Sequence, residues 1–465
     1  MSDLAPQDHP QDLLIVGCGP AGMAAAIAAR KAGLAVTVAD ESSAPGGQIY
    51  RSVLKPFPGS PALGSDYRLG AALAQRFSDS GAVLRPGATV FLIEPGPEGG
   101  FETGLMIAGR GRRVRSRCVL IATGAHERPF PIPGWTLPGV MTAGAAQTMV
   151  KASGVVPEGP LHLVGTGPLL YLLAAQYARL GVPVAALLDT APRQNWLAAL
   201  PHLPAFLGTS YAWKGIGLLR EVLASTRIVR GVEDLSLEGE GRVEEIHYRA
   251  GGRRHGVPTR TVLLHQGVVP QVNLAMACGI PHHWNPDRLA FEPDLGPDGQ
   301  THQPGLYVAG DSGGIAGAQV AEHRGALAAL AILRDMNRDA PDATAPRAAA
   351  RKALRGRRFL DALYRPPDWC RVPTADETIV CRCEEVRAGE IRALARQGAQ
   401  GPNQAKFFSR AGMGPCQGRL CGLTVCETMA AETGRDPEAI GYMRVRMPVK
   451  PVPLAAMADL ARDPV

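Results

Sequence analysis

Two short apolar runs in this chain are each followed by a glycine-rich turn and then by a helix-forming segment rich in alanine or leucine. The first unit has its strands at residues 13–16 and 36–39, and the second at residues 161–164 and 184–188. Strand, turn, helix and strand in this order are typical of a buried parallel βαβ unit. The pattern therefore predicts an α/β fold with two such units.

Each unit is followed by alternating segments that predict an antiparallel meander. In the first copy these segments are residues 89–94, 101–107 and 114–123, and a less regular set covers residues 228–265 in the second. Each meander ends at a glycine, Gly124 or Gly267. The nearly equal spacing indicates that one nucleotide-binding architecture has been duplicated within the chain.

The full chain of 465 residues is long enough for about three domains. A strand that ends in Gly310 and Asp311, with the helix after it, is expected to complete the first domain. The predicted division is a first domain at 10–150 closed by 263–335, a second domain at 155–262, a linker at 336–374, a small cysteine-bearing domain at 375–435 and a tail at 436–465.

The first glycine turn has the G-x-G-x-x-G spacing of dinucleotide-binding proteins, with its glycines at Gly17, Gly19 and Gly22. Such glycines let the backbone turn tightly and approach a pyrophosphate, which the N-terminus of the following helix attracts. Asp40 ends the next strand and is expected to accept the adenosine ribose hydroxyls, with Glu41 as the alternative.

The second glycine turn departs from this pattern because Leu170 stands at the third glycine position. A leucine side chain there obstructs the close packing that a dinucleotide site requires. NAD(H) binding by the second domain is therefore an open alternative. If NAD(H) binds, Asp189 at the end of the following strand favours it over NADP, because a carboxylate repels a 2′-phosphate.

Four cysteines near the C-terminus form a C-x-C pair and a C-x4-C pair, at Cys381, Cys383, Cys416 and Cys421. Alternation along a strand would place Cys381 and Cys383 on one face. Four thiolates are the ligands of a [2Fe-2S] cluster, whereas structural zinc, the alternative, usually takes C-x2-4-C pairs at both ends. Cys426 is a rival ligand, but on a helix after Cys421 it lies about 140° round the axis.

Several classes of protein are disfavoured. The net charge of +7 is small for this length and does not indicate nucleic-acid binding. Nine cysteines are too few for a secreted disulfide framework, and residues 1–12 lack a leader pattern, so we expect a cytoplasmic protein without a membrane span. The histidines are scattered, with His126 after Gly124 the strongest candidate, and no catalytic residue is assigned.

Four sequence segments resemble one known family, the flavin-containing α subunits of opine oxidase, of proline and hydroxyproline dehydrogenase, and of hydrogen cyanide synthase. They are Pro45-Gly46-Gly47-Gln48-Ile49-Tyr50-Arg51, Ala122-Thr123-Gly124-Ala125-His126-Glu127-Arg128-Pro129, Pro133-Gly134-Trp135-Thr136-Leu137-Pro138-Gly139-Val140 and Gly310-Asp311. The cysteine region resembles the [2Fe-2S] domain of bacterioferritin-associated ferredoxin. The fold implied is the double Rossmann architecture of glutathione and thioredoxin reductases with a small C-terminal [2Fe-2S] domain.

The resemblance also implies cofactors and their ligands. FAD would be held by the first domain through the residues of the glycine turn and of the resembling segments, and the cluster by the four cysteines. The FAD residues so implied are Gly17, Gly19, Gly22, Asp40, Glu41, Gly47, Gln48, Thr123, Gly124, Gly310 and Asp311.

The function implied is that of an electron-transferring component of a heteromeric dehydrogenase, partnered by a second flavin subunit. Its substrate class is a secondary amine or imino acid such as an opine, proline or hydroxyproline. A flavin accepts two electrons, whereas an iron-sulfur centre accepts one. The presence of both on one chain therefore suggests an electron relay between them. Two alternatives are a self-sufficient NADH-dependent reductase and a non-catalytic assembly subunit.

Overall fold

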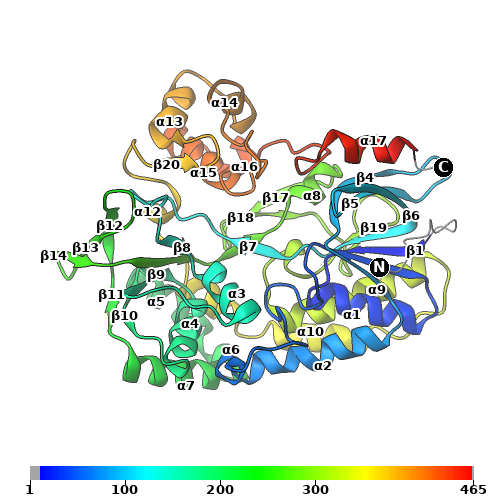
Figure 1. Cartoon of the computed structure of the whole chain (residues 1–465), viewed down its shortest axis with the longest axis horizontal. Coiled ribbons are helices and arrows are strands. Elements are labelled where there is room, and N and C mark those ends of the chain that lie inside the picture. The colour runs from blue at the N-terminus through cyan, green and yellow to red at the C-terminus, as the bar shows by residue number, and fades with distance from the viewer. Residues whose placement is uncertain (1–10, 463–465) are drawn as a thin grey trace.

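Two twisted sheets with helices on their faces form the body of the computed structural model (Figure 1). The structure describes residues 11–462. Residues 1–10 lie outside the described residues, and they make up most of the segment in which no leader is expected. The last three residues of the predicted tail also lie outside them.

The first domain is built on a seven-stranded sheet with the order β3-β2-β1-β6-β5-β4, in which β19 also pairs with β6. The long β6 pairs in parallel with β1 and β19 over its second half and antiparallel with β5 over its first half. The elements are β1 (Gln11–Val16), α1 (Pro20–Lys31), β2 (Val36–Asp40), η1 (Ser60–Leu63), α2 (Ser65–Asp79), β3 (Val83–Pro86), β4 (Thr89–Pro95), β5 (Phe101–Ile107), β6 (Arg110–Ile121), β19 (Leu306–Val308), η3 (Gly310–Gly313) and α9 (Ala318–Asp335).

The second domain has a five-stranded sheet with the order β11-β10-β9-β15-β8, in which every pairing is parallel. Its meander forms a separate three-stranded sheet, β12-β13-β14. The elements are β8 (Val140–Thr142), α3 (Ala143–Ser153), β9 (Leu161–Thr166), α4 (Pro168–Arg179), β10 (Val184–Asp189), α5 (Gln194–Ala199), η2 (Leu200–His202), α6 (Leu203–Leu207), α7 (Ser210–Ser225), β11 (Ile228–Arg230), β12 (Glu233–Glu238), β13 (Glu245–Ala250), β14 (Arg253–Pro258) and β15 (Thr261–Gln266).

Short strands connect the two domains. The chain leaves the first domain through β7 (Ala125–Glu127) and returns through β16 (Val268–Pro270), and these two strands pair antiparallel. They are followed by α8 (Asn273–Ala277) and by the hairpin of β17 (His282–Asn285) and β18 (Ala290–Pro293).

The segment predicted as a linker is folded. It forms α10 (Thr344–Ala353), α11 (Arg357–Leu363) and α12 (Asp368–Arg371). Phe359 and Leu363 of α11 are buried against Ala199 of α5, so this segment packs on the second domain. The many charged residues of this segment predicted an exposed linker. Its few apolar residues pack against residues that are far away in the sequence, so the sequence pattern gives no sign of these contacts.

The cysteine-bearing domain is a small helical unit that lies over β17, β18 and α8 (Figure 1). It comprises β20 (Ile379–Cys381), β21 (Val386–Arg387), α13 (Ala388–Arg396), α14 (Pro402–Ser409), α15 (Gly422–Thr433) and α16 (Pro437–Ile440). The tail returns to the first domain as α17 (Leu454–Arg462), beside β6. The expectation that Cys381 and Cys383 share one strand face is wrong. The strand ends at Cys381 and the chain reverses through a turn, in which Glu385 has a φ of 54°.

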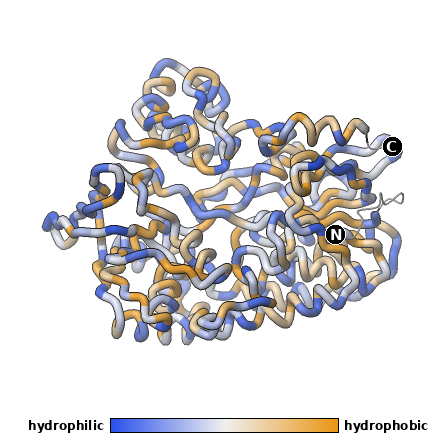
Figure 2. Tube along the Cα trace, viewed as in Figure 1, coloured by the Kyte–Doolittle hydropathy of each residue, from blue (hydrophilic) through white to orange (hydrophobic). Residues whose placement is uncertain are grey.

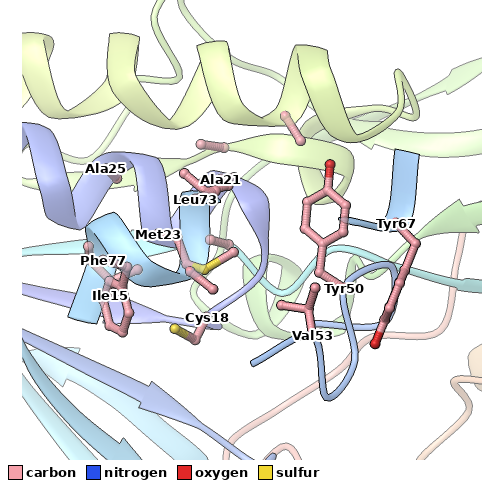
Figure 3. Close-up of a cluster of buried hydrophobic side chains, with 14 of the residues drawn as sticks. Ile15, Cys18, Ala21, Met23, Ala25, Tyr50, Val53, Tyr67, Leu73 and Phe77 are labelled. Carbon is pink, nitrogen blue, oxygen red and sulfur yellow. The ribbon is translucent and has the colours of Figure 1, made fainter. Parts of the chain in front are cut away.

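The largest core cluster lies under the first glycine turn. Ile15, Met23 and Leu73 are buried there, and Figure 3 shows the ring of Tyr50 between the start of α1 and α2. Figure 2 shows that hydrophobic residues follow the strands and helices of both domains, whereas the tip of the β13–β14 hairpin is hydrophilic. Within residues 11–462, no helix has the length and apolar character needed to span a bilayer.

Candidate functional site

The first glycine turn connects β1 to α1 and has two glycines fixed by packing and one whose Cβ position would make only an ordinary van der Waals contact. A Cβ on Gly17 would lie 2.4 Å from the carbonyl oxygen of Ala122, and a Cβ on Gly22 would lie 1.9 Å from that of Gly17. At Gly19 the nearest heavy atom is 3.9 Å away, on Gly47. This turn therefore leaves its middle glycine accessible, as the backbone approach of a pyrophosphate requires.

Two helices whose first turns carry no side-chain cap pack together beside this turn. Neither α1 nor α9 has a side chain that caps its first turn, so their first N–H groups remain available to a ligand. The helices pack closely, since a Cβ on Gly325 of α9 would lie 2.0 Å from the carbonyl oxygen of Ala21. Two uncapped helix starts favour an anionic group at this edge of the sheet.

The carboxylate of Asp40 is held beside the glycine turn. Its Oδ2 accepts a hydrogen bond from the Cys18 N–H at 2.5 Å, and its Oδ1 accepts one from the Ser42 N–H at 2.6 Å. The neighbouring Glu41 instead forms an ion pair with Lys450 of the tail. Of the two acidic residues proposed for the ribose, Asp40 is therefore the one fixed at the turn.

The Gly46-Gly47-Gln48 segment lies against the turn and is supported from the second domain. A Cβ on Gly47 would lie 2.9 Å from the Cα of Gly19. Lys151 of α3 donates from Nζ to the backbone oxygen of Gln48 at 3.2 Å and to Oε1 of Gln147 at 2.8 Å. Burial lowers the pKa of Lys151 to about 7. No sequence motif identifies this lysine, although Gln147 and Lys151 form a polar i, i+4 pair on the buried face of α3.

Lys151 is one end of a buried hydrogen-bonded chain between the domains. Gln147 donates to Gln176 of α4 at 3.0 Å, and Gln176 donates to the backbone oxygen of Leu63 in the first domain at 3.0 Å. This chain holds the position of the Gln48 segment relative to both domains.

The remaining predicted FAD residues lie at the same sheet edge. Thr123 donates to the backbone oxygen of Gln271 at 3.4 Å, and the Gln271 N–H donates to the oxygen of Gly124 at 3.0 Å. A Cβ on Gly310 would lie 2.8 Å from the Cβ of Ala21 in α1. Asp311 Oδ1 accepts hydrogen bonds from the N–H groups of residues 316 and 317, at 2.9 and 3.1 Å. The chain thus brings the predicted FAD residues together around the start of α1.

The second glycine turn has a different environment. Leu170 is fully buried at the third glycine position. The Tyr171 hydroxyl donates to Oδ2 of Asp189 at 2.8 Å, and Tyr364 from the end of α11 contacts the ring of Tyr171, with the ring centroids 6.4 Å apart. Residues from the segment predicted as a linker therefore cover the carboxyl edge of this sheet, where an α/β domain binds nucleotides.

The cysteines form two interacting pairs. Cys381 and Cys421 hydrogen-bond through their side chains, and so do Cys383 and Cys416. The hydrogen bond from Cys421 lowers the pKa of Cys381 to about 6, whereas the same interaction raises that of Cys421. Within the described part of the chain, no three His, Cys, Asp or Glu side chains converge on one point that could hold a single metal ion.

Other cysteines belong to the core. Cys426 is fully buried in α15 and its thiol contacts the backbone oxygen of Pro437 at 3.4 Å. Cys370 of α12 accepts a hydrogen bond from the side chain of Gln266 at 3.1 Å. Neither approaches the paired cysteines through an interaction that would make it a fifth ligand.

A buried charge network fixes the cysteine domain to the body. Glu427 of α15 pairs with Arg371 of α12 and lies 3.9 Å from Arg128, which follows β7. The side chains of Arg128 and Glu427 are 3% and 2% exposed. Burial lowers the pKa of Arg128 to about 9. Removing one member of a buried ion pair leaves an uncompensated charge, so this contact between the cysteine domain and the body depends on all three side chains.

One histidine has a buried acidic partner. Nδ1 of His265 lies 2.8 Å from Glu127, whose other oxygen accepts a hydrogen bond from the Gly144 N–H at 2.5 Å. Because 138 residues separate the two side chains, spacing in the sequence gives no sign of this pair.

The paired sheets and the glycine turn define an oxidoreductase with two dinucleotide-binding domains. Residues 11–325 match the family described as pyridine nucleotide-disulphide oxidoreductase, and residues 375–460 match the sarcosine oxidase A3 domain. The chain is 47% identical over 460 residues to the A subunit of opine oxidase from Agrobacterium tumefaciens (strain Ach5), which covers 97% of this chain and 92% of that protein. It is 32% identical to the HcnB subunit of hydrogen cyanide synthase from Pseudomonas aeruginosa, over 97% of this chain and 99% of that protein.

Solved structures support the same fold. L-proline dehydrogenase from P. horikoshii has a TM-score of 0.75 at 18% identity, over 97% of this chain and 79% of that one. Thioredoxin reductase from T. acidophilum has a TM-score of 0.52 at 19% identity, over 70% of this chain and 99% of that one.

The chain belongs to the pyridine nucleotide-disulphide oxidoreductase family and, within it, to the group that contains the A subunits of opine oxidases. It is an FAD-dependent oxidoreductase, and the predicted fold class and family resemblance are confirmed.

Proposed function

We propose that this chain is the electron-transferring component of a heteromeric dehydrogenase or oxidase, that it carries FAD and a [2Fe-2S] cluster, and that the enzyme oxidises a secondary amine or imino acid. The substrate class is that of opines, proline and hydroxyproline. Similarity over almost the whole chain to a protein named as the A subunit of opine oxidase supports the substrate class and the presence of a second subunit.

The FAD part of the proposal rests on the glycine turn. The accessible Gly19, the two uncapped helix starts and Asp40 suit a pyrophosphate and a ribose. When bound, FAD would accept the two electrons of a substrate C–H bond. The chain's own residues would hold it, with Lys151 fixing the Gln48 segment.

The cluster part rests on the cysteine pairs, and this is the observation that carries the proposal. The two thiol pairs bring four cysteines together, as a [2Fe-2S] cluster requires, and the C-x-C spacing departs from the C-x2-4-C pairs usual for structural zinc. A one-electron centre on a flavin-binding chain would pass the flavin's electrons on singly.

NADH is the alternative electron donor, through the second domain, and would make the chain a stand-alone reductase. The occupied carboxylate of Asp189 and the buried Leu170 weigh against it. We therefore place the amine substrate, on this chain or its partner, as the source of electrons.

The test has two parts. First, the native complex is isolated through this chain and supplied with a dye acceptor, with opines, proline, hydroxyproline or NADH as donor. Dye reduction by an imino acid or opine supports the proposal, whereas reduction by NADH alone overturns it.

Second, iron content and the visible spectrum are compared in Cys383→Ser and Cys426→Ser. The proposal expects Cys383→Ser to lose iron and the cluster's absorbance while Cys426→Ser keeps both, because Cys426 is a core residue. Iron retained by Cys383→Ser, or bound zinc in the unmodified protein, would contradict the cluster assignment.

A further inference from the structure

The cysteine loop, residues 412–421, meets the first domain at the segments that surround its cofactor edge. The side chain of Asn273, at the start of α8, donates from Nδ2 to the backbone oxygen of Gln417 at 3.2 Å. Asn273 is 2% exposed. Gln417 is the residue after Cys416 and has a φ of 52°, so its carbonyl belongs to the turn that presents that thiol.

A second contact comes from β7. The imidazole of His126 hydrogen-bonds the backbone of Arg419, between Cys416 and Cys421. Burial lowers the pKa of His126 to about 4, so the ring is neutral near neutral pH. Both side chains thus hold the stretch of backbone between the two cysteines of the C-x4-C pair.

Both side chains start close to the flavin loop, residues 122–124. His126 is two residues beyond Gly124 in the chain, and Asn273 is two residues beyond Gln271, whose N–H donates to the oxygen of Gly124 at 3.0 Å. Each route from Gly124 to the cysteine loop therefore crosses one side-chain hydrogen bond.

Both side chains also keep a buried polar atom without a partner among the described residues, Nδ1 of His126 and Oδ1 of Asn273. Buried polar atoms are normally paired, so these two atoms are free to bind an ordered water or another group at this position. On its other side the cysteine loop reaches solvent, since Cys383 is exposed beside it.

We propose that His126 and Asn273 are positioning residues that hold the cysteine loop against the flavin loop and thereby set the rate of electron exchange between the two cofactors. This inference rests on the proposed function. The buried pair of Arg128 and Glu427 fixes the domain as a whole, whereas His126 and Asn273 hold the loop that carries the thiols.

The experiment follows reoxidation of the holoprotein. Protein reduced anaerobically and freed of reductant is mixed with cytochrome c, and flavin and cluster absorbance are recorded separately. One reduced flavin gives one electron to each of two cytochrome c molecules, and its two protons pass to solvent. The variants are His126→Leu and Asn273→Ala, with His126→Gln as the rescue because glutamine keeps a donor, and with His283→Leu as the control on the exposed face of β17.

In His126→Leu and Asn273→Ala we expect flavin reoxidation to slow about 10-fold or more, while FAD content is unchanged and the cluster still reoxidises fast. His126→Gln and His283→Leu should match the unmodified protein. Slow reoxidation of the flavin beside fast reoxidation of the cluster is a result that a general loss of stability would not produce.

Two outcomes distinguish the inference from the proposed function. If variants with full FAD and iron reoxidise their flavin at the unmodified rate, the inference is wrong and the proposed function stands. If the unmodified protein holds no iron, the proposed function fails and the inference with it. If a variant loses iron, the amide hydrogen exchange of residues 412–421 is measured instead. Exchange as slow as in the unmodified protein overturns the inference.

Discussion

The hydroxyl of Tyr171 donates a 2.8 Å hydrogen bond to the carboxylate of Asp189, inside the second domain. The other oxygen of Asp189 accepts a hydrogen bond from the Ala191 N–H at 2.9 Å. Burial and the proximity of Asp189 raise the pKa of Tyr171, so the hydroxyl remains a donor. Unlike Asp40, whose two donors are backbone N–H groups, Asp189 therefore already accepts a hydrogen bond from a side-chain hydroxyl of the protein.

This arrangement predicts that the protein does not use NADH. Tyr364 covers the same edge of the sheet, so a nucleotide would have to displace both tyrosines. We expect a Kd for NADH above about 1 mM by calorimetry, and no anaerobic bleaching of the flavin. Dithionite, which needs no nucleotide site, is the positive control for bleaching. Micromolar binding of NADH would contradict the prediction.

The glycine turn predicts that two neighbouring glycine substitutions have different consequences. Gly19→Ala adds a Cβ whose nearest heavy atom is 3.9 Å away, at a φ of −79° that alanine adopts freely, so we expect stability within about 1 kcal/mol of the unmodified protein. FAD affinity should still fall, because the Cβ occupies the open side of the turn.

Gly22→Ala is the matched comparison. Its Cβ would lie 1.9 Å from the carbonyl oxygen of Gly17, so helix and strand must separate, and the loss should reach about 1–3 kcal/mol. Urea unfolding measures the loss of stability in each variant, and retention of FAD on gel filtration measures the loss of FAD affinity. Equal stability losses in the two variants would show that Gly19 has no open side.

The buried network around Glu427 predicts a large loss from a small change. Glu427→Gln leaves the buried guanidinium of Arg128 without an anionic partner among the described residues and leaves Arg371 with the exposed Asp368 alone, which should cost about 3–5 kcal/mol of unfolding free energy. The control is Glu432→Gln on the same helix, whose nearer partner Arg396 is 60% exposed and whose second partner Arg392 keeps its ion pair with Asp376, with an expected loss of about 0–1 kcal/mol. Similar losses for both variants would argue against the network.

Patterns within short stretches of sequence were sufficient to predict the two βαβ units. Gly17 has a φ of 106° and Gly22 packs against the carbonyl oxygen of Gly17, so both glycines are required by the conformation of one strand-turn-helix unit and their spacing carries the information. The C-x-C strand was predicted too long because its alternation continues past Cys381, whereas the turn depends on pairing with β21.

Residues whose role depends on distant contacts were not found. Lys151, Asn273 and Tyr364 each act on a segment separated from them by about a hundred residues or more of chain, or by a domain boundary. A single sequence carries no periodicity that links such positions. The assignment of individual FAD and cluster residues stays a prediction.

Lys151 predicts a pH dependence of stability with a defined sign. Its pKa is about 7 in the folded protein and about 10.4 when unfolded, so between these values the unfolded chain binds a proton that the folded chain does not. The contribution of Lys151 therefore falls as the pH decreases from about 10 to 7, and is constant below that.

Lys151→Met removes both this dependence and the hydrogen bonds to Gln48 and Gln147. Near pH 10 the variant should be less stable by about 1–2 kcal/mol, since only the hydrogen bonds are lost. Near pH 6 the difference should shrink or change sign, because the unmodified protein then buries an ammonium group without an acidic partner. Urea unfolding at both pH values, with the exposed Lys214→Met as control, measures this. A difference independent of pH would mean that Lys151 stays charged in the folded protein throughout this range.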